Sequence, residues 1–235
     1  MEKFLLNNNE RELIFNVLSE YKKLSFNQLM KSTNIRSNKL SYQLKLMLKE
    51  NFLIHKGLKY SLSIKSQKLI PHFSQFYKND VGVLPVVLGI VRNKKKILLI
   101  ERKKMPYKGY WGLFGSKQKN GESISNAIER RIQEESCLNA RFSKVNGILY
   151  ERLIENNEFK HSFLFIITTL KTNSLNAKEQ NDGKVCWFDF EDIINNRIKN
   201  IIPSDIQMIK KYFDKEIEIG HIIMEERGKK LVIAE

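Results

Sequence analysis

The segment of residues 111–138 constrains the fold of this chain more than any other, and it reads WGLFGSKQKNGESISNAIERRIQEESCL. A stretch that contains three glycines precedes a helix that we expect to begin near Ser123. On that helix Arg131, Glu134 and Glu135 stand at i, i+3 and i+4, so their side chains share one face. The segment therefore predicts a loop followed by a helix with a charged face.

In register, this segment resembles the signature of the Nudix family, which runs Gly, five residues, Glu, seven residues, then Arg-Glu-apolar-x-Glu-Glu-x-Gly-apolar. Ser116 and Cys137 stand where the family has glycines, and Arg131 stands where it has a glutamate that binds metal and often acts as base. Six positions in register favour common ancestry over a merely solvated acidic helix face. The matching positions are Glu122, Arg130, Ile132, Glu134, Glu135 and Leu138.

The resemblance implies an α/β/α sandwich with a mixed sheet and a hydrolase that cleaves pyrophosphates. Divalent cations neutralise the substrate's charge and activate water in such a reaction, and Mg²⁺ or Mn²⁺ would take carboxylate oxygens as ligands. By the resemblance Arg130 is a structural cation that orients the acidic cluster. The implied metal ligands are the carbonyl of Gly115 with Glu134 and Glu135, and the implied catalytic residues, if the chain is active, are Glu122, Glu134 and Glu135.

Arg131 changes the electrostatics of the implied metal site. Its guanidinium can reach carboxylates at i+3 and i+4 and neutralise them, and it removes one oxygen ligand. Glu129 does not restore the ligand, because it lies about 200° around the helix from position 131. The sequence therefore favours loss of ordinary catalysis. It leaves open an enzyme that takes its base from elsewhere, for which Glu155 and Glu158 are candidates in a nearby loop.

A pocket without a metal would need cations of its own to bind a nucleoside diphosphate, and arginine suits phosphate recognition. Lys104 is a further cation near this segment. Trp111 and Phe114 resemble core residues of the family's loop, so two tyrosines are preferred for stacking on a base. The candidate ligand-binding residues are Arg102, Lys117, Arg131, Tyr107 and Tyr110.

Positive charge is concentrated in the first third of the chain. Residues 1–78 hold 14 Lys or Arg against 5 Asp or Glu, whereas the remaining 157 residues hold 27 against 21. A concentrated positive field favours a polyanionic partner, most simply nucleic acid, although a lysine-rich solvated surface is the plainer alternative. We also expect a cytoplasmic protein that is not in a membrane. The two cysteines lack metal-type spacing, and we find no signal peptide and no apolar run of membrane-spanning length.

Residues 1–78 are expected to form a DNA-binding domain. Apolar spacing predicts a helix over residues 10–21 whose buried face carries Leu13, Ile14, Val17, Leu18 and Tyr21. A capping box of Ser25 and Gln28 begins a second helix over residues 26–32 with Leu29 and Met30 turned inward, and a third helix begins at Ser37. A hairpin over 52–62 around Gly57 and a closing helix over 64–77 follow. This order resembles a winged helix-turn-helix, whose second motif helix enters the major groove. The alternative is a winged helix used for protein contact. By that resemblance the candidate DNA-binding residues are Ser37, Asn38, Lys39, Tyr42 and Gln43 for reading base edges, and Arg36, Lys45, Lys56 and Lys59 for phosphate contacts.

Residues 82–214 are expected to form the Nudix-like domain, so the fold class is α+β. Strands are predicted over 85–91, 97–102, 144–151, 159–170 and 184–188, with helices over 190–195 and 204–213 after them. The tail, residues 215–235, is expected to form a hairpin that turns at Glu-Arg-Gly-Lys.

Two functions fit these features. The first is a DNA-binding transcriptional regulator, expected as a homodimer on double-stranded DNA, whose Nudix-like domain senses a nucleotide-type small molecule. Nudix-related regulators that sense ADP-ribose are a precedent for it. The second is an active metal-dependent Nudix hydrolase of a nucleoside diphosphate derivative with an accessory winged helix. An interaction module without a small ligand is a third possibility.

Overall fold

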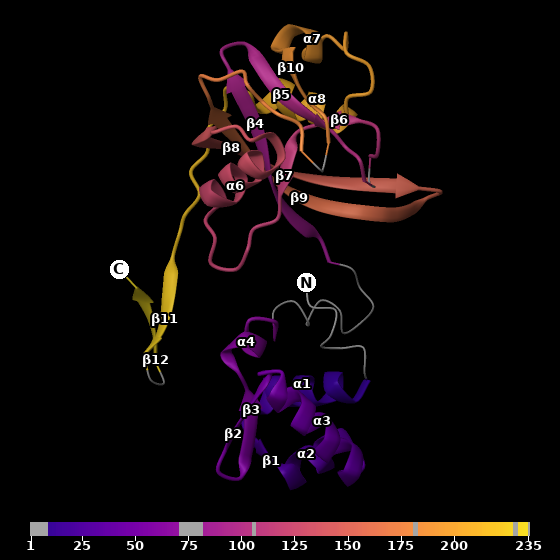
Figure 1. The fold of residues 1–235 in the computed structure, drawn as a ribbon, viewed down its shortest axis with the longest axis vertical. Coiled ribbons are helices and arrows are strands. Elements are labelled where there is room, and N and C mark those ends of the chain that lie inside the picture. The colour runs from indigo at the N-terminus through magenta and orange to yellow at the C-terminus, as the bar shows by residue number, and fades with distance from the viewer. Residues whose placement is uncertain (1–8, 71–81, 105–106, 181–182, 228–229, 235) are drawn as a thin grey trace. The chain divides into compact units, whose positions relative to one another are not determined.

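A computed structural model of the chain describes residues 9–70, 82–104, 107–180, 183–227 and 230–234. The chain divides into two compact units, Met1–Gly82 and Val83–Glu235, shown from indigo to purple and from magenta to yellow in Figure 1. Each unit has a hydrophobic core of its own. Among the described residues, no helix has the length and apolar character that a membrane crossing requires.

The first unit combines helices with a small antiparallel sheet of strand order β1-β3-β2. The strand between its first two helices pairs with β3, which also pairs with β2 as a hairpin. This order of elements is like that of a winged helix-turn-helix. The elements are α1 (Asn9–Tyr21), β1 (Leu24–Ser25), α2 (Phe26–Thr33), α3 (Ser37–Lys49), β2 (Leu53–Lys56), β3 (Lys59–Leu62) and α4 (Ile64–Gln67).

Local sequence signals explain where these elements begin and turn. The Ser25 hydroxyl accepts a hydrogen bond from the backbone N–H of Gln28, and the Gln28 side chain accepts one from the backbone N–H of Ser25. This capping box satisfies two donors at the start of α2. Asn34 ends α2 in the left-handed region at φ 56°, and Gly57 turns the β2–β3 hairpin at φ 60°. The expected starts of the second and third helices are confirmed.

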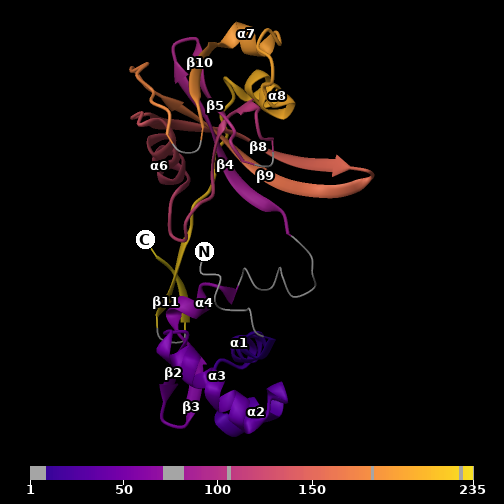
Figure 2. The same cartoon turned by 45° about the vertical axis from the view of Figure 1, so that its right-hand side comes forward.

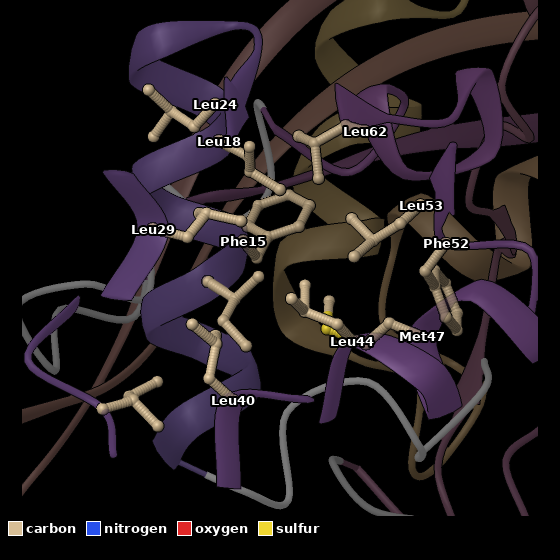
Figure 3. Packing of buried hydrophobic residues seen from close by; sticks show 12 residues of the cluster. Phe15, Leu18, Leu24, Leu29, Leu40, Leu44, Met47, Phe52, Leu53 and Leu62 are labelled. Atoms are coloured by element: carbon tan, nitrogen blue, oxygen red, sulfur yellow. The ribbon is translucent and has the colours of Figure 1, made fainter. Parts of the chain in front are cut away.

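The core of the first unit corrects the predicted buried face of α1. Phe15 is 1% exposed and lies in the middle of the cluster in Figure 3, although the predicted stripe did not include it. Leu13 and Tyr21 were expected inside but are 40% and 56% exposed. The buried face falls on Ile14, Phe15 and Leu18 because α1 packs against α2, α3 and β3 together.

The second helix and the closing helix also differ from the prediction. Met30 was expected to turn inward, but it is 36% exposed. The buried residues of α2 are Leu29 and Thr33. The helix expected over residues 64–77 is described as the four-residue α4, which begins after its cap Ser63. Residues 71–77 lie outside the described residues.

The second unit is built on a mixed seven-stranded sheet. The path β10-β5-β4-β9-β8 contains one parallel pair, β4 with β9, while β6 and β7 pair with β5 and β4. The expected strands and helices are present with shifted ends. Two short strands, β6 (Trp111–Gly112) and β7 (Phe114–Ser116), were not predicted. The expected elements are β4 (Leu84–Asn93), β5 (Lys96–Glu101), α6 (Ile124–Ser136), β8 (Arg141–Glu155), β9 (Glu158–Lys171), β10 (Val185–Asp189), α7 (Phe190–Ile194) and α8 (Pro203–Tyr212).

Helices cover both faces of this sheet. Side chains alternate along β4, so Leu88 joins a core with residues of α7 and α8, whereas Val87 joins a second core with residues of α6. Figure 2 shows α6 apart from α7 and α8, with β4 and β5 between them. Gly89 allows α6 to approach closely, because a Cβ there would lie 2.8 Å from Cγ1 of Ile128. The result is the α/β/α sandwich that the resemblance implies.

Strands β8 and β9 form a long hairpin that extends beyond the rest of the sheet (Figures 1 and 2). The sequence predicted shorter strands, over 144–151 and 159–170, separated by a loop. Asn156 and Asn157 instead make a tight turn with φ 52° and 64°. Asparagine tolerates this left-handed conformation better than most residues, so the two strands can pair up to the turn.

The tail forms a two-stranded ribbon of β11 (Ile223–Arg227) and β12 (Lys230–Ala234). The predicted hairpin is therefore present. Residues 228–229 of its expected turn lie outside the described residues.

Candidate functional site

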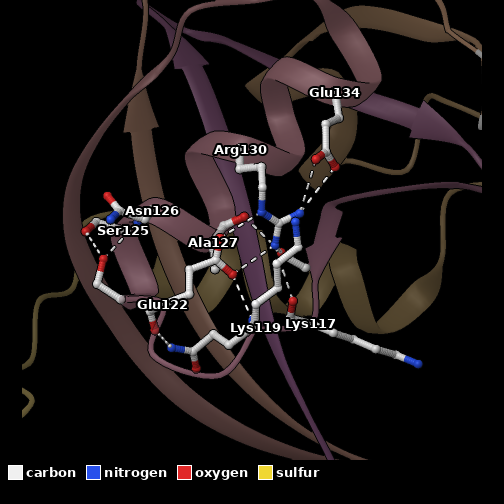
Figure 4. Close-up of polar contacts among 11 residues, drawn as sticks. Lys117, Lys119, Glu122, Ser125, Asn126, Ala127, Arg130 and Glu134 are labelled. Carbon is white, nitrogen blue, oxygen red and sulfur yellow. Dashed lines mark hydrogen bonds and ion pairs between the residues drawn. The ribbon is translucent and has the colours of Figure 1, made fainter. Parts of the chain in front are cut away.

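Helix α6 begins at a serine cap and carries the charged residues singled out by the sequence. The Ser123 hydroxyl accepts a hydrogen bond from the backbone N–H of Asn126. Arg130 donates from Nε to Oε1 of Glu122 at 2.7 Å and from Nη2 to Oε2 at 2.9 Å. Its Nη1 also lies 3.2 Å from Oε2 of Glu134 (Figure 4). Arg130 therefore ties the loop before α6 to the middle of the helix.

The loop before α6 is held by Glu122. Its Oε2 accepts a hydrogen bond from the backbone N–H of Lys119 at 2.8 Å, in addition to the two from Arg130. The hydrogen bonds from Arg130, followed by the one from Lys119, lower the pKa of Glu122 to about 2. Glu122 stays ionised and occupied by these donors, which makes it a structural anion in this geometry.

Ser116 and Cys137, the residues in place of two glycines of the signature, have distinct surroundings. Ser116 is 1% exposed, and its hydroxyl donates to the backbone carbonyl of Ala127 at 2.8 Å, which links β7 to α6. Cys137 ends α6 in the left-handed region at φ 53°, where its N–H donates to the carbonyl of Gln133. This is the conformation that favours glycine at a helix C-terminus.

Arg131 forms an ion pair with Glu135 on the next turn of α6. The side chain of Glu135 is 4% exposed and that of Arg131 is 30% exposed, so the pair is largely shielded from water. Charge-assisted hydrogen bonds are strong in such surroundings, and removal of one partner leaves a buried charge uncompensated. The guanidinium thus stands beside the carboxylate at the place where the resemblance implies a metal-binding glutamate.

Two adjoining cavities lie beside this ion pair. The larger has a volume of about 460 Å³ and the smaller about 290 Å³, and both are lined by Arg102, Arg131 and Gly115. Lys117 and Arg130 line the larger cavity as well, whereas Glu135 lines the smaller one. Apolar side chains of β4 and β9 form a wall of the larger cavity. They are Leu84, Val86, Leu88, Phe163 and Phe165.

Acidic side chains that the sequence analysis did not select line the larger cavity. The Tyr107 hydroxyl donates to Oε1 of Glu151 at 3.0 Å, while Oε2 of Glu151 is buried without a hydrogen-bond partner among the described residues. Asp205 accepts a hydrogen bond from the backbone N–H of Leu113 at 2.6 Å. Alternation along β8 could have indicated Glu151, but Asp205 reaches the cavity only through the packing of α8.

Burial controls the protonation of this acidic part of the cavity. Burial raises the pKa of Asp205 to about 7, and the N–H of Leu113 offsets part of the effect. Burial, and then the charge of Glu151, also raise the pKa of Tyr107 above its ordinary value of 10, so that its hydroxyl stays a donor. Tyr107 holds its place in the left-handed region at φ 65°, an uncommon conformation for a bulky residue.

The other predicted site residues are spread over different surroundings. Tyr110 is 42% exposed and lines neither cavity. Glu134 is half exposed beside Arg130, and Glu155 pairs with Lys160 at 2.5 Å near the tip of the β8–β9 hairpin. Neither residue lines a described cavity, and the side chain of Glu158 is not described.

The described residues do not fit the metal site that the resemblance implies. Among them, no group of three or more His, Cys, Asp or Glu side chains is arranged to hold a metal ion. Glu134 and Glu135 are paired with arginines, and position 131 supplies a cation where an oxygen ligand is needed.

The predicted DNA-binding residues lie mostly on the surface of α3 and of the β2–β3 hairpin. All of them except Gln43 are exposed, including Tyr42 at 61%. Gln43 is 7% exposed, and its Oε1 accepts a hydrogen bond from Nε of Arg11 at 2.9 Å, which does not suit the predicted base-reading role. Lys39 pairs with Glu10 at 3.0 Å. The exposed remainder is Arg36, Ser37, Asn38, Lys39, Tyr42, Lys45, Lys56 and Lys59.

Comparison with known proteins identifies the second unit. Residues 83–212, more than half of the chain, match the sequence model of the NUDIX domain. Over 92 residues the chain is 32% identical to the ADP-ribose pyrophosphatase of Methanocaldococcus jannaschii. The matched stretch is 39% of this chain and 52% of that protein. Over 108 residues it is 25% identical to the uncharacterized Nudix hydrolase YvcI of Bacillus subtilis, covering 45% of this chain and 66% of that protein.

A similar fold occurs in the solved NUDIX domain of Shewanella oneidensis NrtR, which is complexed with ADP-ribose. The TM-score is 0.47 at 16% identity, covering 60% of this chain and 94% of that one. Overall, the matched stretches span about half to two thirds of the length of the curated relatives.

Proposed function

This chain belongs to the Nudix family through residues 83–212, and we propose that it is a DNA-binding transcriptional regulator. In this proposal the Nudix domain binds a nucleoside-diphosphate-type metabolite and does not carry out ordinary metal-dependent catalysis. The first unit binds double-stranded DNA. The ligand changes DNA affinity by binding the DNA-competent and incompetent states of the protein with different affinities.

The ion pair between Arg131 and Glu135 is the observation that carries the proposal. A metal-dependent pyrophosphohydrolase needs carboxylate oxygens free to hold its cations. Here an arginine replaces one carboxylate and binds a second, which lowers the negative charge of the site. The same guanidinium lines both cavities, so it supplies fixed positive charge where a diphosphate would bind.

The larger cavity has the chemistry to hold a nucleoside diphosphate. Arg102, Lys117 and Arg131 give it cationic groups for the phosphates, and arginine can bind phosphate oxygens with two hydrogen bonds. Phe163 and Phe165 add aromatic surface, with ring centroids 5.4 Å apart. Glu151 lines the same cavity, and its Oε2 is buried without a hydrogen-bond partner among the described residues, which favours a ligand with a hydroxyl or N–H group in this part of the cavity. The volume of about 460 Å³ is within the usual range for small-molecule sites.

Binding of double-stranded DNA by the first unit rests on charge and on exposed residues. The exposed Lys45, Lys56 and Lys59 are suited to phosphate contacts, whereas Asn38 and Tyr42 are suited to base edges. Residues 1–78 carry 14 basic against 5 acidic residues, which supports a polyanionic partner.

A panel of substrates tests the catalytic part of the proposal. The intact protein would be incubated with ADP-ribose, NAD, diadenosine polyphosphates, nucleotide sugars and nucleoside triphosphates, with Mg²⁺ and separately with Mn²⁺. We expect no turnover. We further expect one of the diphosphate compounds to bind in titration calorimetry and to change the affinity for duplex DNA.

The second candidate function is an active Nudix hydrolase with Mg²⁺ or Mn²⁺ as cofactor. It is favoured by the retained Glu134 and Glu135 and by 32% identity to an ADP-ribose pyrophosphatase. If the parent protein turns over a compound of the panel and Glu135→Gln does not, this function is established and the proposal of a sensor without catalysis is overturned. Turnover that persists unchanged in Glu135→Gln would indicate a contaminating hydrolase and leave the sensor standing.

A further inference from the structure

The β8–β9 hairpin exposes an apolar face, which we call the outer hairpin face. It consists of Ile148, Tyr150, Ile154, Phe159 and Leu164, which are 49%, 51%, 55%, 64% and 38% exposed. The cross-strand pairs Tyr150↔Leu164 and Ile154↔Phe159 hold these side chains on the same side of the hairpin. The opposite side carries Glu151 and Phe163, which line the larger cavity.

We propose that the outer hairpin face is the contact between two copies of this chain in a homodimer. The proposal assigns a surface to the homodimer that the sequence led us to expect, and it rests on the exposed residues of this surface and not on DNA or ligand binding. Soluble monomers rarely expose contiguous apolar patches of more than a few hundred Å². An unpaired strand edge is also usually covered or blunted, and β8 is the outermost strand of the sheet path.

The area of the outer hairpin face matches what a stable dimer needs. Its exposed fractions, applied to side chains of roughly 150–200 Å² each, give about 400–500 Å² of apolar surface. A standard interface buries about 800 Å² on each partner, of which roughly 56–65% is apolar. The face thus supplies about the apolar share of one side of such an interface.

The chemistry of the face is suited to contact with itself. The Arg152 guanidinium lies 5.6 Å from the ring centroid of Tyr150 and 5.4 Å from that of Phe159 on the same hairpin. The quadrupole of an aromatic ring attracts a cation over its face, so each copy of the face presents both aromatic rings and a cation that the rings of the other copy can bind. Aromatic residues and arginine are the residues enriched at the centres of protein interfaces.

A sedimentation experiment on the full chain tests this proposal. Ile154→Ser combined with Phe159→Ser removes two of the most exposed apolar side chains of the face. Leu175→Ser is the matched control, because Leu175 is 48% exposed in the same unit but outside the face. We expect the parent and the control to be dimers at micromolar concentration and the double variant to dissociate at least about 30-fold more readily.

A monomeric parent, or a double variant that stays as dimeric as the control, would overturn the proposal. If the double variant does not fold by circular dichroism, the single variant Ile154→Ser replaces it. Partial dissociation of that variant supports the proposal, and dissociation equal to that of the control contradicts it.

Discussion

Replacement of Asp205 by asparagine is expected to remove a pH dependence of stability from the second unit. Asp205 is 6% exposed, and burial raises the pKa of its carboxyl group from 3.8 to about 7. Between these two values the folded state holds a proton that the unfolded state has lost. The free energy of unfolding therefore falls as the pH rises from about 4 to about 7, and it levels off above that.

The size of the effect follows from the pKa shift. One pKa unit corresponds to about 1.4 kcal/mol, so this group removes on the order of 3 kcal/mol of stability between pH 5 and pH 8. Asparagine has nearly the same size and can still accept the hydrogen bond from Leu113, but it does not titrate. Asp205→Asn should therefore be more stable than the parent at pH 8, and this advantage should shrink toward pH 5.

Urea unfolding followed by tryptophan fluorescence measures this difference in the correct unit, because Trp111 and Trp187, the two tryptophans of the chain, both lie there. Asp214→Asn is the control, since the side chain of Asp214 is 86% exposed. Its pH profile should follow that of the parent. Parallel profiles for the parent and Asp205→Asn would refute the argument that burial holds a proton on Asp205.

Two further predictions concern the end of α6 and the first unit. Cys137→Gly should stabilise the second unit by about 1 kcal/mol and raise its Tm by roughly 2–4 °C, because Cys137 holds a left-handed φ of 53° that glycine adopts without strain. An unchanged or lower Tm in thermal unfolding would contradict this. Lys56→Ala should lower the slope of log affinity against log salt by about 1 for duplex DNA, whereas Lys95→Ala, an exposed lysine of the second unit, should leave the slope unchanged. Equal slopes for both variants would remove Lys56 from the DNA contact.

The parts of the fold that sequence predicted well are those set by local chemistry. The capping box at Ser25, the turn at Gly57 and the cap at Ser123 each depend on residues within a few positions of one another. The buried face of α1 depends instead on three elements that pack against it, and for that reason the stripe was misplaced at Leu13 and Tyr21.

In the candidate site, too, the sequence predicted the contacts between neighbours in the chain but not the contacts between distant segments. The spacing on α6 was sufficient to bring Arg131 next to Glu135, because residues four apart on a helix are neighbours. Asp205 and Glu151 come from distant segments, and their burial in one cavity depends on how α8 and β8 pack on the sheet. A local sequence pattern does not predict that tertiary packing will bury a particular carboxyl group.

The central claim is that Arg131 supplies the positive charge that a metal ion would otherwise bring. The most direct test compares the Tm of the parent and of Arg131→Glu with and without Mg²⁺ or Mn²⁺. We predict that the metals stabilise only the variant, by about 3 kcal/mol at a concentration 100-fold above the dissociation constant, because glutamate restores an oxygen ligand and frees Glu135. Equal responses of the parent and the variant to metal would contradict the account.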